Sequence, residues 1–290
     1  MMLRVATGTA LLLAVGVCSL AAQRASSFHP DLRRYVAVDA PVVALTNATL
    51  IDGTGAAPRS GQTIVISGNR IQAVGPTGSV AVPAGAHVVD ASGHTVIPGL
   101  MGMHDHMFYT TQGGMVQSPY SFPRLYLGTG VTTVRTTGSF APYAELNLKT
   151  NIERHQMPGP RIHITGPYLI SQGNDLRLDQ MGMHKIETEA AARRVVRHWA
   201  EEGAEWIKGY TQLSRDIFRA VIDEAHKHGM KVTGHLCSIS FTEAVELGID
   251  NIEHGFRTNS DYDTAKKPDE CPASHFETLG KLDMKDPRIA

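Results

Sequence analysis

The chain has 290 residues, of which 42% are hydrophobic and 19% are charged, and this composition excludes a disordered protein. Its formal net charge of −1 gives no electrostatic reason to expect nucleic acid or an anionic membrane surface as a partner. A small-molecule substrate is therefore the expected partner, and the sequence leaves a homo-oligomer open.

The first segment has the pattern of an export signal. A basic residue precedes an apolar run over residues 10–17, and small residues follow. The run is shorter than the roughly 20 residues of a membrane-spanning helix, so we predict a cleaved signal peptide over residues 1–22 and a periplasmic or secreted protein. An N-terminal anchor helix is the alternative. Lipidation at Cys18 is disfavoured because Val17 before it is bulky.

The cysteine content bears on stability. After the predicted signal peptide only Cys237 and Cys271 remain. Two cysteines do not make a disulfide framework, so we expect the hydrophobic core to stabilise the fold without one.

Three regions follow the signal. Residues 23–41 mix Ser, Arg, His and Pro without periodicity, which indicates a linker. Residues 42–97 hold short β-rich runs separated by Gly, Pro, Asn and Asp, which predicts a small antiparallel β-domain of the sandwich type. Over residues 98–290 apolar strands alternate with amphipathic helices, the pattern of βα units around a parallel sheet.

The βα pattern predicts an α/β fold, a (β/α)8 TIM-like barrel, with a doubly wound open sheet as the alternative. Helices are expected over residues 188–202 and 214–228, and a capping box at Ser240 opens a third that ends at Gly248. A complete barrel needs eight strands and roughly 250 residues, so we expect an incomplete barrel and a chain truncated at its C-terminus. The strand candidates are residues 95–106, 131–138, 161–167, 205–210, 231–236 and 251–256.

Four histidines follow strand candidates. His104 and His106 are two residues apart at the end of the first one, so their side chains point to the same face. His235 and His254 end two later strands, and the carboxyl ends of barrel strands meet at one mouth. Because neutral imidazole suits zinc and related metals, this pattern predicts a metal site. The alternative is a set of structural histidines.

Lys208 ends the strand in GAEWIKGY, and a lysine inside an apolar strand must be neutralised, paired or modified. From the residues alone, an ion pair with a carboxylate inside the barrel is the favoured interpretation.

Together these motifs resemble the metal-dependent amidohydrolase superfamily, and its imidazolonepropionase-like and prolidase-like branch in particular. The resemblance is carried by ATLIDGTG, VIPGLMGMHDH, GAEWIKGY, VTGHL and NIEHG. It implies two divalent metal ions, with zinc favoured. His104 and His106 would bind one ion, His235 and His254 the other, and a carbon dioxide-derived carbamate on Lys208 would bridge them.

The sequence departs from the family pattern at two places. Gly102 stands where the family often has Asp. The family's general-base aspartate at the end of strand eight has no candidate, since the aspartates of the polar tail lie outside any strand pattern; they are Asp261, Asp263, Asp269, Asp283 and Asp286.

The resemblance implies hydrolysis of a C–N bond in a dipeptide, an N-acyl amino acid or a cyclic amide, by a metal-bridging hydroxide. Tyr109, Thr137 and Tyr210 are the substrate-binding candidates, because they lie in loops after strands. The alternatives are a non-catalytic fragment or metal-binding module, and a lactonase or esterase that uses the same site.

Overall fold

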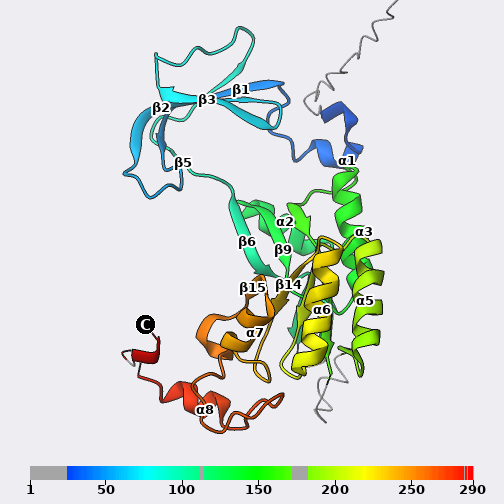
Figure 1. Ribbon diagram of the computed structural model, residues 1–290. Coiled ribbons are helices and arrows are strands. Elements are labelled where there is room, and N and C mark those ends of the chain that lie inside the picture. The colour runs from blue at the N-terminus through cyan, green and yellow to red at the C-terminus, as the bar shows by residue number, and fades with distance from the viewer. Residues whose placement is uncertain (1–24, 112–113, 172–181, 284, 286, 290) are drawn as a thin grey trace, which may run out of the picture. The chain divides into compact units, whose positions relative to one another are not determined.

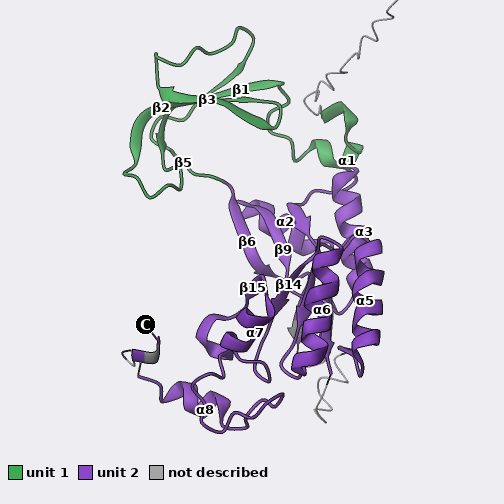
Figure 2. Ribbon diagram, viewed as in Figure 1, with its two compact units in different colours: residues 1–98 green, residues 99–290 purple. Residues whose placement is uncertain are grey.

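The computed structural model describes residues 25–111, 114–171, 182–283, 285 and 287–289. The predicted signal peptide, with Cys18, lies outside the described residues. The chain divides into two compact units, Met1–Pro98 and Gly99–Ala290 (Figure 2). Within the described ranges, no helix has the length and apolar character needed to cross a membrane.

The first unit contains one five-stranded sheet with the strand order β3-β2-β1-β4, and β5 also pairs with β1 (Figure 1). Two short helical segments precede it, η1 and α1. The bounds are η1 Ala25–Ser27, α1 Pro30–Arg33, β1 Val42–Leu50, β2 Arg59–Ser67, β3 Arg70–Pro76, β4 His87–Asp90 and β5 Thr95–Val96.

This sheet is mixed. β2 is antiparallel to β1 and β3, whereas β4 and β5 run parallel to β1. The expectation of a purely antiparallel domain is therefore wrong, because the alternation of apolar residues predicts strands but not their direction. The described residues of this unit make one sheet, so the predicted sandwich is not confirmed. Ile71 and Val88 accordingly stay 69% and 54% exposed.

The second unit is built on two sheets of parallel strands. One sheet has the order β10-β9-β6 and another the order β12-β11-β13-β14-β15, while β7 and β8 form a separate antiparallel hairpin. The bounds are β6 Leu100–Asp105, β7 Phe108–Thr111, β8 Gly114–Gln117, β9 Val131–Thr136, β10 Arg161–His163, β11 Thr165–Ile170, β12 His184–Lys185, β13 Trp206–Gly209, β14 Lys231–Gly234 and β15 Asn251–Ile252.

The third predicted strand, residues 161–167, is interrupted at Ile164. Its first part, β10, pairs with β9, and its second part, β11, pairs with β13 and continues to Ile170. The Ile164 carbonyl accepts hydrogen bonds from the backbone N–H groups of Glu205 and Trp206, so the chain passes from one sheet to the next at this residue. From β11 through β13 and β14 to β15 the strands are neighbours in sequence order, and only the two-residue β12 pairs with the other side of β11 within the described residues. This order fits an arc of a barrel.

Helices lie between the strands, and α5 and α6 pack side by side (Figure 1). Thr188 and Ser214 cap α5 and α6 through their hydroxyls, and the predicted capping box of Ser240 and Glu243 is present at α7. The bounds are α2 Ser121–Gly128, α3 Pro142–Glu153, α5 Glu189–Glu201, α6 Arg215–Lys227, α7 Phe241–Leu247, η2 Gly255–Thr258, α8 His275–Gly280 and η3 Pro287–Ile289.

The core of this unit lies between the strands and these helices. The apolar stripes predicted for α5 and α6 are part of it, since Val196 and Val221 are fully buried beside Ile207 and Val232 of the strands. The helices α2 and α3 were not predicted. Both helices have a proline near their start, and α3 has low amphipathicity. Apolar periodicity therefore did not predict them.

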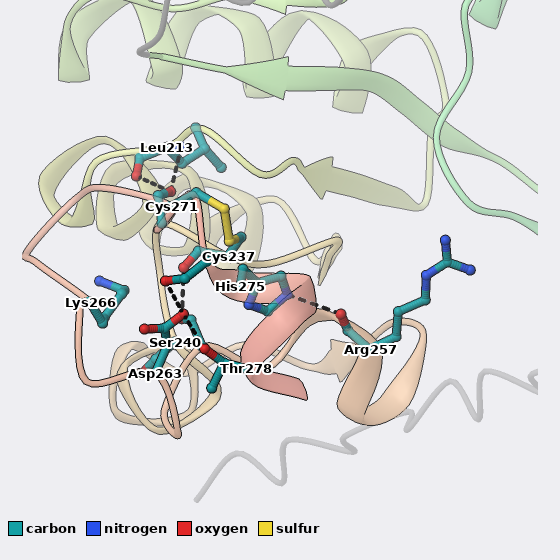
Figure 3. The surroundings of a disulfide bond; sticks show 12 residues. Leu213, Cys237, Ser240, Arg257, Asp263, Lys266, Cys271, His275 and Thr278 are labelled. Carbon is teal, nitrogen blue, oxygen red and sulfur yellow. Dashed lines mark hydrogen bonds between the residues drawn. A yellow bond between two sulfur atoms is a disulfide. The ribbon is translucent and has the colours of Figure 1, made fainter. Parts of the chain in front are cut away.

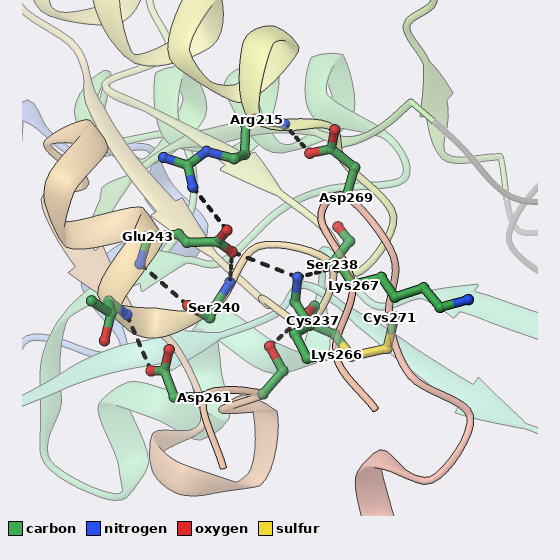
Figure 4. A network of polar contacts seen from close by, with 12 residues as sticks. Arg215, Cys237, Ser238, Ser240, Glu243, Asp261, Lys266, Lys267, Asp269 and Cys271 are labelled. Carbon is green, nitrogen blue, oxygen red and sulfur yellow. Dashed lines mark hydrogen bonds and ion pairs between the residues drawn. A yellow bond between two sulfur atoms is a disulfide. The ribbon is translucent and has the colours of Figure 1, made fainter. Parts of the chain in front are cut away.

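A disulfide joins Cys237, just after β14, to Cys271 in the C-terminal segment (Figure 3). The expectation that the core acts without a disulfide is therefore wrong. The two cysteines are 34 residues apart, and their proximity arises only when the tail folds back to the end of β14. Polar contacts hold the same segment, since Asp269 accepts a hydrogen bond from the Arg215 backbone and Lys266 pairs with Glu243 (Figure 4).

Candidate active site

A cavity of about 310 Å³ lies in the second unit. The predicted metal ligands converge on it from different strands, with His104 near the end of β6, Lys208 on β13, and His235 and His254 just after β14 and β15. The lining residues are His104, His106, Phe108, Met115, Phe140, Tyr168, Met183, Lys208, Tyr210, His235, His254 and Arg257.

The four imidazoles form a chain of ring contacts. The ring centroids of His104 and His106 are 5.3 Å apart, those of His104 and His254 4.4 Å, and those of His235 and His254 4.3 Å. His254 adopts a left-handed backbone conformation, with φ of 65°, which is uncommon for a residue with a side chain. The structure therefore brings all four predicted histidines together.

Glu253 contacts this histidine cluster through His104. The side chain is 4% exposed and accepts hydrogen bonds from His104 Nδ1 at 2.6 Å and Arg135 Nη2 at 2.6 Å. Thr233 Oγ1 and Asn251 Nδ2 also donate to it. Since Nδ1 of His104 is engaged, Nε2 is the ring nitrogen left for another ligand. Sequence reasoning missed Glu253, although it directly precedes His254.

The environment keeps three of these histidines, His106, His235 and His254, neutral. Burial lowers the pKa of His235 to about 3, and neighbouring His254 and Lys208 act in the same direction. Burial also lowers the pKa of His106 and of His254 to about 4, again with a contribution from the charge of Lys208. Three imidazoles are thus neutral near pH 7, the state in which a ring nitrogen can coordinate a metal ion.

Lys208 is 1% exposed, and its ammonium lies 5.3 Å from the ring centre of Tyr168. Burial lowers the pKa of Lys208 to about 8, although the charge of Glu253 opposes this shift. No carboxylate among the described residues lies within ion-pair distance of Lys208. The ion pair that the residues alone favoured is therefore not seen in the described part of the chain.

The substrate-binding candidates are placed differently from one another. Tyr210 lines the cavity, with its ring 4.6 Å from that of His235. Tyr109 lies on the hairpin strand β7, is 62% exposed, and is not among the lining residues. Thr137 is fully buried and also outside the lining. Tyr168 and Arg257, which sequence reasoning missed, do line the cavity.

Gly102, the first departure from the family pattern, faces Asp105. A Cβ at residue 102 would lie 1.6 Å from Asp105 Oδ2, so the Asp105 carboxylate occupies the space that a side chain at 102 would need. Oδ2 of Asp105 is buried without a hydrogen-bond partner in the described residues, and burial raises the pKa of this carboxyl. A glycine at 102 is therefore required by this arrangement.

Known proteins resemble this chain in sequence and in fold. The sequence profile of the amidohydrolase family matches residues 95–267. The chain belongs to the amidohydrolase family. A comparison with curated proteins found no match.

The solved structures similar to this family member include prolidase-like proteins. A proposed prolidase from Bifidobacterium longum is 30% identical with a TM-score of 0.61, over 74% of this chain and 54% of that one. A prolidase complexed with N-methylphosphonate-L-proline is 23% identical, with a TM-score of 0.60, over 74% of this chain and 61% of that one. A Xaa-Pro dipeptidase with methionine bound in its active site is 21% identical, with a TM-score of 0.65, over 83% and 73%. The chain thus spans little more than half the length of the first two, and the last two show the fold alone.

Members of the amidohydrolase family generally use divalent metal ions. No group of three or more His, Cys, Asp or Glu side chains in the described residues is arranged to hold a metal ion. The chemistry of the donors nevertheless fits, because neutral imidazoles surround one cavity and Lys208 is buried without a counter-charge within ion-pair distance.

The tail aspartates that are described serve other partners. Asp263 accepts hydrogen bonds from Ser274 and Thr278, while Asp261 and Asp269 accept from the backbone N–H groups of Thr242 and Arg215. Asp283 accepts from the backbone of Lys285, and Asp286 lies outside the described residues. None of the described ones lines the cavity.

Proposed function

We propose that this amidohydrolase is a metal-dependent hydrolase of C–N bonds. The observation that carries the proposal is the convergence of four histidines from three strands, with Lys208, on one cavity. Two histidines separated by one residue share a face of their strand. The packing of the fold alone gives no reason for the single histidines of later strands to meet this pair. The left-handed conformation of His254 adds support, since unusual backbone geometry gathers at functional sites.

His104 and His106 would hold one metal ion, and His235 and His254 a second. Lys208 would bridge them as a carbamate. This modification requires the neutral amine, and at a pKa of about 8 a useful fraction of Lys208 is neutral near pH 7. When bound, two divalent ions supply a hydroxide at neutral pH and polarise the scissile carbonyl.

The chain's own residues contribute orientation. Glu253 fixes His104 with Nε2 free, and Arg135 neutralises the carboxylate that does so. Tyr168 and Tyr210 pack against each other with ring centres 5.5 Å apart on the cavity wall, and the Tyr168 hydroxyl lies 3.4 Å from His106 Nδ1. A tyrosine hydroxyl at this position can donate a hydrogen bond to a substrate carbonyl.

A dipeptide is the favoured substrate class, ahead of an N-acyl amino acid or a cyclic amide. The similar structures include a prolidase and a Xaa-Pro dipeptidase, and these names support a peptide substrate. An esterase or lactonase activity is the second candidate, because the same site would attack a carbonyl carbon with an oxygen leaving group. Zinc is the proposed metal, because the donors are imidazoles.

Export is proposed on two grounds. The N-terminal sequence has the pattern of a signal peptide, and a disulfide is stable chiefly in an oxidising compartment. Together they support a periplasmic or secreted protein.

Metal stoichiometry tests the proposal most directly. The purified protein, supplied with zinc and bicarbonate, should hold about two zinc ions per chain by elemental analysis. Lys208→Ala should hold fewer than the wild type and lose dipeptide hydrolysis, because the bridge between the ions is gone. Lys281→Ala is the control, since the Lys281 side chain is 73% exposed and is not among the lining residues of the cavity.

Less than one zinc per chain in the wild type would overturn the proposal. Unchanged zinc content and hydrolysis in Lys208→Ala would remove Lys208 from the site and return it to a structural role. Hydrolysis of an ester or lactone with no hydrolysis of the matching dipeptide would favour the second candidate.

A further inference from the structure

Arg257 is a positive charge at the cavity that has no assigned task. It lies on η2, three residues after His254, and it lines the cavity with the histidines. The backbone around it is fixed, because Thr258 donates a hydrogen bond to the Glu253 carbonyl and His275 contacts the Arg257 carbonyl at 3.0 Å. The guanidinium points away from the disulfide and from His275 (Figure 3).

Arg257 has no counter-charge in the described residues. No carboxylate of the described part lies within ion-pair distance of its guanidinium, in contrast to Arg135, Arg197 and Arg215, which are all paired. The described cavity lining also contains no Asp or Glu, although it contains both Arg257 and Lys208. Arg257 remains a cation whether or not Lys208 is modified, and a cavity with a guanidinium and no acid in its described lining attracts an anion.

The rest of the wall is apolar. Phe108, Tyr168 and Met183 are buried and pack together, with Phe140 and Met115 against them. The cavity therefore combines a hydrophobic surface, a row of imidazoles and a guanidinium, which suits a ligand with an apolar group and a carboxylate. A guanidinium binds a carboxylate through two parallel hydrogen bonds, so this pairing also fixes the orientation of the ligand.

We propose that Arg257 binds the free α-carboxylate of the substrate. The site would then accept dipeptides and N-acyl amino acids whose carboxylate is free, and reject the same compounds when that carboxylate is masked. This inference rests on the proposed function, and it specifies the substrate class as dipeptides or N-acyl amino acids with a free carboxyl end and an apolar side chain. Arg257 is thereby a specificity-determining residue. A cyclic amide without a carboxylate would lack this contact.

The test separates carboxylate binding from metal binding and turnover. Protein treated with a chelator is titrated with N-acetyl-L-leucine and, in parallel, with N-acetyl-L-leucinamide, and binding is followed by NMR. The two ligands differ only in the carboxylate. The wild type should bind the acid about tenfold or more tightly than the amide, as expected for a charge-assisted hydrogen bond. Arg257→Gln should bind both alike, and Arg257→Lys should keep part of the preference.

Arg219→Gln is the matched control, because the Arg219 side chain is 50% exposed on α6 and pairs with Asp216. It should keep the full preference, and thermal unfolding should show that Arg257→Gln is folded. The proposal would be overturned if Arg257→Gln preferred the acid over the amide as strongly as the wild type does. It would also be overturned if this preference were lost in Lys208→Met but kept in Arg257→Gln. Absence of any preference in the wild type would overturn it too. Because no metal is present, these outcomes are independent of the zinc stoichiometry that tests the proposed function.

Discussion

Glu253 and Glu145 are two of the three glutamates that are buried among the described residues of the second unit, and their surroundings are opposite. Glu253 accepts hydrogen bonds from His104, Arg135, Thr233 and Asn251. Glu145, in the first turn of α3, is 1% exposed, and neither of its carboxylate oxygens has a hydrogen-bond partner in the described residues. Both carboxyls lie near Tyr168, so the difference between them is one of partners rather than of depth.

The partners decide the protonation state. Burial raises the pKa of Glu253, but hydrogen bonds from His104 and Thr233 and the charge of Arg135 outweigh it and bring the pKa to about 2. Burial raises the pKa of Glu145 to about 7, and the nearby Ser139 and Thr136 offset only part of the effect. One glutamate is thus a fixed anion that orients a proposed metal ligand, and the other changes its charge near neutral pH.

The largest predicted effect comes from removing the anion. Glu253→Met should lower the free energy of unfolding by about 3–5 kcal/mol, because it leaves the buried guanidinium of Arg135 without its counter-charge. Chemical denaturation of wild type and variant measures this difference.

The control for this prediction is a double-mutant cycle with Arg135→Met. The double variant should lose less stability than the sum of the two single losses, since it removes both charges together. Additive losses would show that the ion pair between Glu253 and Arg135 contributes nothing beyond packing.

The next effect concerns Glu145 and depends on pH. Its pKa is higher in the folded state than the ordinary 4.5, so the folded state retains a proton that the unfolded state loses between pH 4.5 and about 7. Stability therefore falls as pH rises through this window and stays lower above it. Glu145→Gln should raise the free energy of unfolding at pH 8 by up to about 3 kcal/mol and leave it nearly unchanged at pH 4.

Glu153→Gln provides the comparison for Glu145→Gln. Glu153 is on the same helix but its side chain is 62% exposed, so its replacement should have little effect at either pH. If Glu145→Gln gave the same change in stability at pH 4 and pH 8, the carboxyl of Glu145 would not titrate in this range.

The smallest effect tests one partner of Glu253. Thr233→Val removes a hydroxyl donor with little change of shape and should cost about 1–2 kcal/mol. The pKa of Glu253 should rise, and because a carboxylate with a lowered pKa loses its contribution as pH falls, acid unfolding should begin at a higher pH. Thr242→Val, on the exposed face of α7, should leave the acid transition where it is; an equal shift in both variants would contradict the role of Thr233.

Much of the second unit was predictable from sequence. The helices α5, α6 and α7 carry strong periodicity, capping residues and terminal glycines, which act over a few neighbouring residues, and they appear within about one residue of their predicted bounds. The positions of His104, His235 and His254 at strand ends were predictable because the apolar runs that mark strands are also local in sequence. The family resemblance itself is confirmed by the profile match over residues 95–267.

Other features were decided by contacts between distant parts of the chain. Glu253 meets His104 across 149 positions in sequence and Arg135 across 118, and no local pattern encodes such a meeting. The same holds for the Cys237–Cys271 disulfide, for the mixed direction of the first sheet, and for the placement of Arg257 at the cavity. Spacing along the chain fixes which face a side chain takes, whereas the charge state and the partner of a buried group depend on what the tertiary structure brings against it.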